Sequence, residues 1–489
     1  MNDPTAPPKP FDLAVGARKA MLDNGFEPDF PEEALRELEA LTASAPPLPA
    51  HERDLRGLCW SSIDNRESRD LDQLEVAERL EDGFIRILVG VADVDAFVPR
   101  GSALDAHAHR NSASVYTGAA VFPMLPDRLS TDLSSLNEGE DRPAVVIDFV
   151  VRPGGEIVSS DVYCALVRSR AKLAYEAIAE WLDGAPPPEI VAESPELARQ
   201  LRVQDEAAQR LKALRQERGA LDLETIEARP VAVDGRVVDL TLTGKNRARD
   251  MIEDFMIAAN GAMARFLAAA QVPSIRRVVR APERWQRLCA LAAGLGDALP
   301  SEPSSRALAA LLARRKAAAP DHFADFSLAV VKLMGPGEYA LDRPGSPSPG
   351  HFGLAVQDYT HSTAPNRRYA DLVTQRLVKA AIAGGRAPYS EDELAAIALH
   401  CTLKENDARK VERTTRKEAA ALLLADRIGE TFEAIVTGVS SKGTFVRLLH
   451  PPAEGRVVRG EQGVDVGDRF VVTLLATEPS RGFIDFARV

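Results

Sequence analysis

The apolar and polar positions of this chain first predict two buried strands with an acidic loop between them. The segment LCWSSID, residues 58–64, is apolar enough to end a buried strand, and FIRILVGVADVDAFV, residues 84–98, is a longer apolar run. The residues between them are rich in acids, and Asp93 and Asp95 lie within the second run. The pattern therefore predicts a sheet that presents carboxylates at one edge.

Other stretches have the three-to-four-residue spacing of amphipathic helices. They are residues 13–24, 31–44, 197–218 and 403–428, and a capping box of Ser390 and Glu393 opens a further helix. The first two predict a small helical unit over residues 1–50. This unit is either a helix-turn-helix (or small winged helix) or a helical appendage packed on the rest of the chain. Strands and helices together predict the α+β class.

The last part of the chain, residues 427–489, has a different pattern. Short alternating strands are separated by glycine-containing turns, which predicts a small closed β-barrel. The opening of this part resembles the OB-fold RNA-binding domain first described in a small-subunit ribosomal protein. We therefore expect three units, over residues 1–50, 51–426 and 427–489.

The composition narrows the class of protein without identifying it. The 489 residues are 45% hydrophobic and 27% charged, which is typical of a soluble globular protein. The net charge of −12 argues mildly against a protein that coats nucleic acid, but not against cations that line one channel. We find no apolar run of membrane-spanning length and no signal-like start. Four cysteines stand far apart: Cys59, Cys164, Cys289 and Cys401. We therefore expect a cytoplasmic protein without membrane contact.

Three aspartates fall within nine residues of the acidic loop. They are Asp64, Asp70 and Asp72. If residues 69–73 are extended, Asp70 and Asp72 project from one face, and the loop from Asp64 brings a third carboxylate near them. Oxygen ligands of this kind favour Mg²⁺ or Mn²⁺. The alternative is a polar loop with scattered acids.

Seven sequence blocks in a fixed order identify a family resemblance. They are SSIDNRESRDLDQ, GVADVDAFVPRGSALDAHAHRNSASVY, VFPMLPDRLSTDLSSLNEGEDRPAVVIDF, SRAKLAYEAI, RGALDLETIEA, MIEDFMIAAN and HFGLAVQDYTHSTAPNRRYADLVTQRLVKA. Together they resemble the ribonuclease II family, the RNB-domain exoribonucleases, over about residues 55–385. The resemblance implies a mixed β-sheet surrounded by helices over residues 51–426. Relatives of this type usually carry two cold-shock OB-folds before it, for which the first fifty residues leave no room.

The resemblance also implies an activity. Members degrade single-stranded RNA processively from the 3′ end with Mg²⁺, releasing nucleoside 5′-monophosphates, and we expect a monomer that does not act on DNA. Asp64, Asp70 and Asp72 match metal-binding aspartates, and Asp72 matches the most critical acid. Where the family has a fourth aspartate this chain has Gln73, whose amide oxygen can still bind a metal. The rival hypothesis is a non-catalytic RNA-binding or regulatory protein on a decayed nuclease scaffold.

Two further family blocks supply charged candidates for the chemistry. In HSTAPNRRYADL, the resemblance assigns Arg367 to the scissile region. Because adjacent arginines cannot both face one way on a regular element, one is expected to grip phosphate and the other to pair with a carboxylate such as Asp371. Arg367 and Arg368 are therefore both RNA-binding candidates. Glu253 matches an acid of the catalytic pocket.

The remaining candidates are RNA contacts and one unassigned glutamate. Tyr116 matches the residue that stacks the 3′-terminal base, and Tyr175 matches a tyrosine of the RNA path. The second aromatic of the terminal clamp is replaced by Leu221 and Leu223. In the barrel the candidates for base stacking and phosphate contact are Phe432, Phe445 and Arg447, with core packing as the alternative for the aromatics. A late helical glutamate, usual in the family, is not assigned among Glu412, Lys417 and Glu418.

Overall fold

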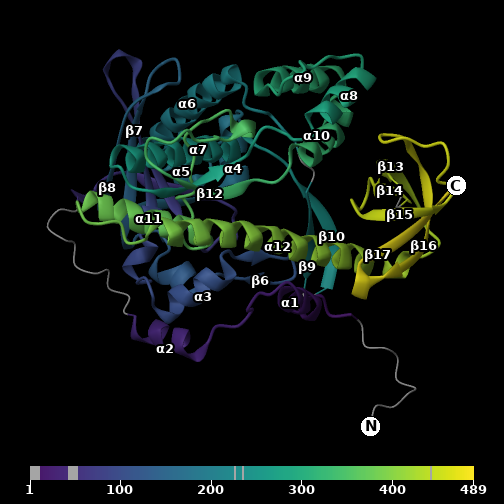
Figure 1. The fold of residues 1–489 in the computed structure, drawn as a ribbon, viewed down its shortest axis with the longest axis horizontal. Coiled ribbons are helices and arrows are strands. Elements are labelled where there is room, and N and C mark those ends of the chain that lie inside the picture. The colour runs from purple at the N-terminus through teal and green to yellow at the C-terminus, as the bar shows by residue number, and fades with distance from the viewer. Residues whose placement is uncertain (1–10, 42–52, 225–226, 234–235, 441–442) are drawn as a thin grey trace, which may run out of the picture.

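The computed structural model of the protein describes residues 11–41, 53–224, 227–233, 236–440 and 443–489. A mixed sheet surrounded by helices is joined by one long helix to a C-terminal barrel (Figure 1). The expected α+β class with a C-terminal barrel is therefore confirmed. None of the described helices is both long and apolar enough to cross a membrane.

The main sheet has six strands. In spatial order they are β1 (Arg53–Asp54), β8 (Ile157–Ala174), β2 (Trp60–Asp64), β3 (Gln73–Arg79), β4 (Ile85–Ala92) and β7 (Asp141–Val151). Strand β7 at one edge also pairs with β8 near the other edge. The long strand β8 pairs with β7 along its first part and with β2 along its last part, so the sheet curls around on itself. The two predicted strands of the acidic region are present as β2 and β4.

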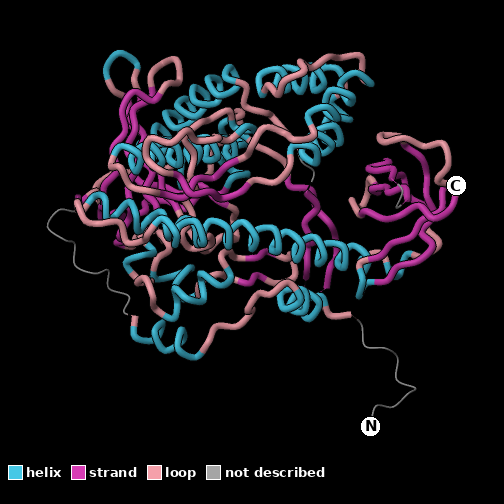
Figure 2. The backbone as a smooth tube through the Cα atoms, viewed as in Figure 1, coloured by secondary structure: helices cyan, strands magenta, loops and turns pink. Residues whose placement is uncertain are grey.

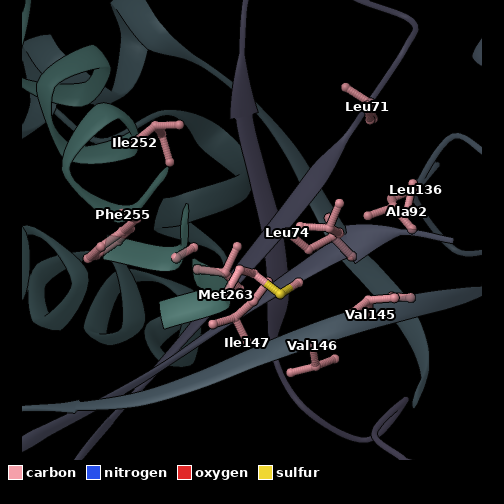
Figure 3. Close-up of a cluster of buried hydrophobic side chains, with 14 of the residues drawn as sticks. Leu71, Leu74, Ala92, Leu136, Val145, Val146, Ile147, Ile252, Phe255 and Met263 are labelled. Atoms are coloured by element: carbon pink, nitrogen blue, oxygen red, sulfur yellow. The ribbon is translucent and has the colours of Figure 1, made fainter. Parts of the chain in front are cut away.

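The hydrophobic core lies between this sheet and the helices that cover it. Leu74, Val145 and Ile147 come from the sheet, and Phe255 and Met263 come from helix α7 (Arg247–Ala269) (Figure 3). The near-continuous apolar stretches of β4 and β7 are explained by burial on both faces. This packing fixes the helices against the sheet ends, where the polar candidates lie.

The other helices and small sheets surround this core. The helices are α3 (Ala103–Asn111), α4 (Tyr175–Leu182), α5 (Glu189–Ala192), α6 (Pro195–Arg218), α8 (Trp285–Gly294), α9 (Ser305–Ala318), α10 (Pro320–Met334) and α11 (Tyr369–Ile382). The two-stranded sheets pair β5 (Val115–Tyr116) with β6 (Val121–Phe122), β9 (Glu227–Val233) with β10 (Arg236–Thr243), and β11 (Ser274–Val278) with β12 (Glu338–Asp342). The helix predicted over residues 197–218 is confirmed as α6, with Ser194 as its N-cap and Gly219 in the left-handed conformation at its end.

One long helix, α12 (Glu391–Leu423), crosses the molecule toward the barrel (Figure 1). Its predicted capping box is confirmed, because Ser390 and Glu393 exchange the two expected hydrogen bonds. The sequence analysis treated this region as two helices, and that division is wrong. Residues 391–423 contain neither glycine nor proline, so nothing interrupts a single helix.

The two N-terminal helices pack at separate places. Helix α1 (Leu13–Asp23) lies against α12, and helix α2 (Glu32–Ala40) lies against α3 (Figure 1). A helix-turn-helix packs its two helices on each other. The structure therefore favours the alternative of a helical appendage packed on the rest of the chain. The predicted unit boundaries themselves stay predictions.

The C-terminal barrel is closed and has five strands. Their spatial order is β13 (Thr431–Ser440), β14 (Gly443–Leu448), β15 (Glu454–Arg459), β17 (Phe483–Arg488) and β16 (Arg469–Glu478). Figure 2 shows these strands gathered at one end of the molecule, apart from those of the main sheet. Ala420, Ala421 and Leu424, at the end of α12, share a hydrophobic cluster with the barrel interior. The barrel is therefore packed on the long helix.

Candidate active site

A cavity of about 630 Å³ opens at one end of the main sheet. It lies where β2 and β8 end and β3 begins, because β2 and β8 run parallel and β3 runs antiparallel to β2. Its lining residues are Asp64, Asn65, Ser68, Asp70, Asp72, Gln73, Tyr116, Thr117, Gly118, Val121, Tyr175, Arg249, Ile252, Glu253, Met256, Thr363, Arg367, Glu412 and Arg416. Residues from sequence positions 64 to 416 thus meet in one place.

The three aspartates all line this cavity. Asp64 is the last residue of β2, and its Oδ1 accepts hydrogen bonds from the backbone N–H of Asn65 at 2.7 Å and from Ser68 Oγ at 2.9 Å. Asp70 and Asp72 precede β3, and buried Leu71 lies between them, which gives the expected alternation. The acids lie at the edge of the sheet formed by strand ends, where β2 ends and β3 begins.

Burial dominates the electrostatics of Asp72. The residue is only 3% exposed, and burial raises the pKa of its carboxyl group to about 6 even though the charge of Arg367 acts in the opposite direction. Arg367 Nε donates a hydrogen bond to Asp72 Oδ2 at 2.8 Å. The other oxygen, Oδ1, is buried and accepts no hydrogen bond from any described residue. Burial also raises the pKa of Asp64.

The donor set suits a hard divalent cation, although the described conformation does not assemble its ligands. Carboxylates of Asp64, Asp70 and Asp72 and the amide of Gln73 present only oxygen ligands suited to Mg²⁺. The buried, unpartnered Oδ1 of Asp72 is an acceptor for such an ion. Within the described ranges, however, no three His, Cys, Asp or Glu side chains are close enough to hold a metal together. Arg367 instead supplies the positive charge beside Asp72.

The two adjacent arginines have different partners, as expected. Arg367 faces the cavity, with 45% of its side chain exposed. Arg368 donates two hydrogen bonds to Asp371, from Nε at 2.8 Å and from Nη2 at 2.7 Å. The predicted pair with Asp371 is therefore confirmed for Arg368. Its expected role in RNA binding stays a prediction, which the occupied fork and its place outside the cavity lining do not support.

Buried hydrogen bonds hold the loop that carries Arg367. Asp371, which is fully buried, accepts a hydrogen bond from the backbone N–H of Ala364 at 2.9 Å. Asn260 Oδ1 on α7 accepts hydrogen bonds from Ser362 through its backbone N–H and its Oγ, both at 2.8 Å. The loop is therefore fixed to two helices, which orients Arg367 toward the cavity.

The two tyrosines line the cavity from different sides. Tyr116 is on β5, and its hydroxyl donates to Asp70 Oδ2 at 3.3 Å. The residue is 44% exposed, which leaves a surface for stacking. Tyr175 begins α4 directly after Ala174, the residue paired with Asp64, and Arg249 lies over its ring at 4.4 Å. Both tyrosines are therefore placed beside the acids.

The sequence analysis left a functional glutamate unassigned on α12, and the structure separates the candidates. Glu412 lines the cavity and accepts a hydrogen bond from the backbone N–H of Tyr116 at 3.5 Å, whereas Glu418 is buried beside α1. Six helical residues rotate a side chain about 120° away from the first, so the two cannot share a face. Glu253 lines the cavity from α7, as expected. Arg416, one turn after Glu412, was missed.

The remaining candidates lie outside the cavity. Leu221 and Leu223 pack against a separate hydrophobic cluster with α8, α9 and α10. Neither lines the cavity, so neither takes the place of a clamp residue in it. Phe432 is 6% exposed in the barrel interior, so its expected stacking role is wrong and the core alternative is correct. Arg447 Nη2 donates a hydrogen bond to Asp325 Oδ1 on α10 at 2.9 Å, so the Arg447 guanidinium already has a partner within the protein. Phe445 is 38% exposed.

Comparison with known proteins identifies the family. Residues 52–384 match the RNB domain, and residues 430–489 match the C-terminal S1 domain of RNase II-type exonucleases. The chain belongs to the RNB family of exoribonucleases. Ribonuclease R 1 of Lactococcus lactis is 30% identical to this RNB protein over 450 residues, which cover 89% of this chain and 54% of that protein. The chain spans between 49% and 61% of the length of four ribonuclease R proteins that it matches.

Solved structures share the fold of this RNB protein. Mycoplasma genitalium RNase R in complex with ribose methylated single-stranded RNA aligns with a TM-score of 0.88 at 23% identity, over 98% of this chain and 78% of that chain. The same relative in complex with double-stranded RNA aligns with a TM-score of 0.87 at 24% identity, over 98% of this chain and 83% of that chain. The curled sheet and the closed barrel therefore belong to one known architecture.

Proposed function

We propose that this chain is an exoribonuclease that hydrolyses single-stranded RNA processively from its 3′ end and releases nucleoside 5′-monophosphates. One observation carries the proposal: Asp72, Arg367 and Tyr116 lie together in a cavity at the strand ends of an RNB domain. We assign catalysis to the unit over residues 51–426 and RNA binding to the barrel over residues 427–489. The matches over residues 52–384 and 430–489 support this division.

The proposal includes Mg²⁺, for which Mn²⁺ can substitute. Asp64, Asp70, Asp72 and the amide of Gln73 would hold it, since all four line one cavity. When bound, the metal supplies an activated water and neutralises charge on the phosphoryl oxygens. The Asp64, Asp70 and Asp72 carboxylates would repel an RNA phosphate in the cavity, and a bound cation would offset that repulsion.

The chain's own cations and rings position the RNA. Arg367 balances the charge of Asp72 and presents its remaining N–H groups toward the cavity, where they suit a phosphoryl oxygen. Tyr116 offers an exposed ring on which the last base stacks. Arg249 and Arg416 line the same cavity and add positive charge to a wall otherwise rich in acids. Glu253 and Glu412 border the space left for the terminal nucleotide.

RNA is the proposed partner, and DNA is not. One relative, Mycoplasma genitalium RNase R, was solved in complex with ribose methylated single-stranded RNA and with double-stranded RNA. We propose single strands for this chain, with preference for RNA through its 2′-hydroxyl groups. We also propose that the protein acts as a monomer in the cytoplasm. All four cysteines lie in described ranges and form no disulfide there, which suits a reducing compartment.

A labelled-RNA assay tests the function. Oligo(A) carrying a 5′ label is incubated with the protein and Mg²⁺, with EDTA or without metal, beside a deoxyribose oligomer of equal length. We expect the full-length band to give way directly to a short 5′-labelled end product, AMP to be detected by chromatography, the reaction to depend on the metal, and DNA to be degraded little. Intact RNA with Mg²⁺ present, while the protein still binds it, would establish the non-catalytic alternative.

A further inference from the structure

Two adjacent buried serines lie between the two loops that supply the charged groups of the cavity. Ser134 and Ser135 directly follow the short π-helix Leu129–Leu133, and they are 2% and 0% exposed. Arg142 on β7 donates a hydrogen bond from Nε to the backbone carbonyl of Ser135 at 3.1 Å, which fixes the pair to the main sheet. Neither serine lines the cavity. A buried hydroxyl is costly unless it forms hydrogen bonds, so the partners of these two indicate their role.

Ser135 holds the chain on both sides of Asp70. Its Oγ accepts a hydrogen bond from the backbone N–H of Leu71 at 3.0 Å. It donates to the backbone carbonyl of Arg69 at 2.9 Å, which is closer than its second acceptor, Asn137 Oδ1 at 3.1 Å. One side chain therefore bonds the residue before and the residue after Asp70, whose carboxylate lines the cavity.

Ser134 contacts the other loop. Its Oγ donates a hydrogen bond to Asn366 Oδ1 at 2.7 Å, which is closer than its second acceptor, the backbone carbonyl of Leu129 at 2.9 Å. Asn366 is 1% exposed and directly precedes Arg367, whose Nε donates to Asp72 Oδ2. Adjacent hydroxyls thus reach the loop that carries the acids and the loop that carries the arginine.

We propose that Ser134 and Ser135 are positioning residues, which hold the Asp70 segment and the Arg367 loop in place relative to each other. The proposal rests on the proposed function. Neither serine touches the reacting groups, and each acts through the loop that it holds. A displacement of about 1 Å in a reacting group can lower a rate about 100-fold, so bonds that fix both loops to one point should affect catalysis. Because each loop has its own hydroxyl, the two effects should be separable.

Mn²⁺ binding and single-turnover cleavage separate the two effects in the full chain. Free Mn²⁺ is followed by its electron paramagnetic resonance signal. We expect Ser135→Ala, which frees the Asp70 segment, to weaken Mn²⁺ binding roughly 10-fold and to regain most of its cleavage rate at saturating Mn²⁺. We expect Ser134→Ala to bind Mn²⁺ as the wild type does and to cleave bound RNA roughly 10-fold more slowly at every Mn²⁺ concentration.

Two further variants control for a general loss of stability. Ser130 is a buried serine in the same π-helix, 5% exposed, whose Oγ donates to the carbonyl of Pro126 at 3.3 Å. Ser130→Ala should lower the melting temperature about as much as the other two replacements and leave Mn²⁺ binding and cleavage unchanged. Asn366→Ala removes the partner of Ser134 and should slow cleavage by the same factor as Ser134→Ala. The double variant Ser134→Ala, Asn366→Ala should be no slower than either single variant.

The outcomes decide between positioning and a merely structural role. Equal changes in Ser130→Ala, Ser134→Ala and Ser135→Ala, or wild-type behaviour of the last two, would overturn the proposal. If either of the last two does not fold, Asn366→Ala and the volume-conserving Ser135→Cys decide by the same measurements, and loss of folding in these also overturns it. If the wild type still degrades RNA with Mg²⁺ in those cases, the proposed function stands. If the wild type neither binds Mn²⁺ nor degrades RNA, both fail.

Discussion

At the scale of single residues, the adjacent pair Arg367 and Arg368 shows how neighbours in sequence acquire different roles. Arg367 contacts Asp72 in the cavity and keeps nearly half of its side chain exposed. Arg368 is bound at two points by Asp371, whose side chain is fully buried. These contacts favour the proposed role of Arg367 in the reaction and a structural role for Arg368, and substitutions should separate the two roles.

Replacing Arg367 by alanine should abolish most of the activity and leave the fold intact. The variant loses the guanidinium that balances Asp72 and faces the cavity, so we expect the rate of RNA cleavage to fall about 10²–10³-fold. The melting temperature should change little, since the side chain is 45% exposed. Arg367→Lys should recover only part of the rate, because an ammonium group lacks the planar fork. Single-turnover cleavage, measured beside a thermal melt, checks both results.

Replacing Arg368 by alanine should lower the stability of the fold. The change leaves the Asp371 carboxylate buried without its partner, which typically costs about 3–5 kcal/mol of stability. The free energy of unfolding, measured by urea titration, should therefore fall. The double variant Arg368→Leu, Asp371→Leu removes both charges and should restore part of the loss. A stable Arg368→Ala protein that has lost RNA affinity would instead return this residue to the RNA-binding candidates.

Single residues also show which parts of the candidate site the sequence could predict. Ordered motifs placed Asp64, Asp70, Asp72, Tyr116, Tyr175, Glu253 and Arg367 correctly in one cavity. The prediction that Phe432 stacks a base was wrong, because alternation along a strand shows that neighbouring residues face opposite ways but not which face lies inside the barrel. In the barrel, Phe432 lies inside and Phe445 outside.

At the scale of elements, helix α12 links the cavity to the barrel and to the N-terminal helix. Glu418 on this helix is 6% exposed. Gly482, which directly precedes β17, approaches the backbone of α12 beside this residue, because an added Cβ there would lie 2.6 Å from Lys417 Cβ. Helix α1 packs against the carboxylate itself, because an added Cβ at Gly16 would lie 2.8 Å from Glu418 Oε2. The sequence could not reveal this contact, because it joins segments about 400 residues apart.

The stability of this junction should depend on pH. Burial raises the pKa of Glu418 to about 7 from its ordinary value of 4.5, against the smaller opposing effect of Lys19. The folded protein therefore keeps a proton that the unfolded chain loses, so this contribution to stability falls as pH rises from about 4.5 to 7. Glu418→Gln should be more stable than the wild type at pH 8, by about 1–3 kcal/mol, and equally stable at pH 4. Urea titrations at several pH values measure the difference, and a constant difference would contradict this explanation.

At the scale of the whole molecule, apolar packing and an ion pair hold the barrel to the rest of the described chain. Arg447 on β14 pairs with Asp325 on α10 at 2.9 Å, and both side chains are only 11–12% exposed. The barrel also shares its hydrophobic cluster with the end of α12. Patterns in the sequence predicted the barrel itself, but its attachment depends on contacts between units that are far apart in the chain.

Breaking this ion pair should loosen the barrel. Asp325→Ala leaves Arg447 nearly buried without its partner, at a cost on the order of 3 kcal/mol. We expect faster amide hydrogen exchange in β14 and unchanged exchange in β3 and β4 of the main sheet. The control is Arg481→Ala, which removes an exposed pair with Glu478 and should have little effect. Equal exchange in both variants would show that apolar packing alone holds the barrel.

The central claim is that the cavity receives the 3′ end of RNA beside a divalent cation. The most direct measurement is a crystal structure of the wild-type chain with a single-stranded oligoribonucleotide whose last linkage resists hydrolysis, grown with Mn²⁺ and located by anomalous scattering. We predict the 3′-terminal base on Tyr116, its phosphate between Arg367 and the ion, and the ion against Asp72. RNA bound elsewhere, its 5′ end in the cavity, or Mn²⁺ away from the aspartates would contradict the account.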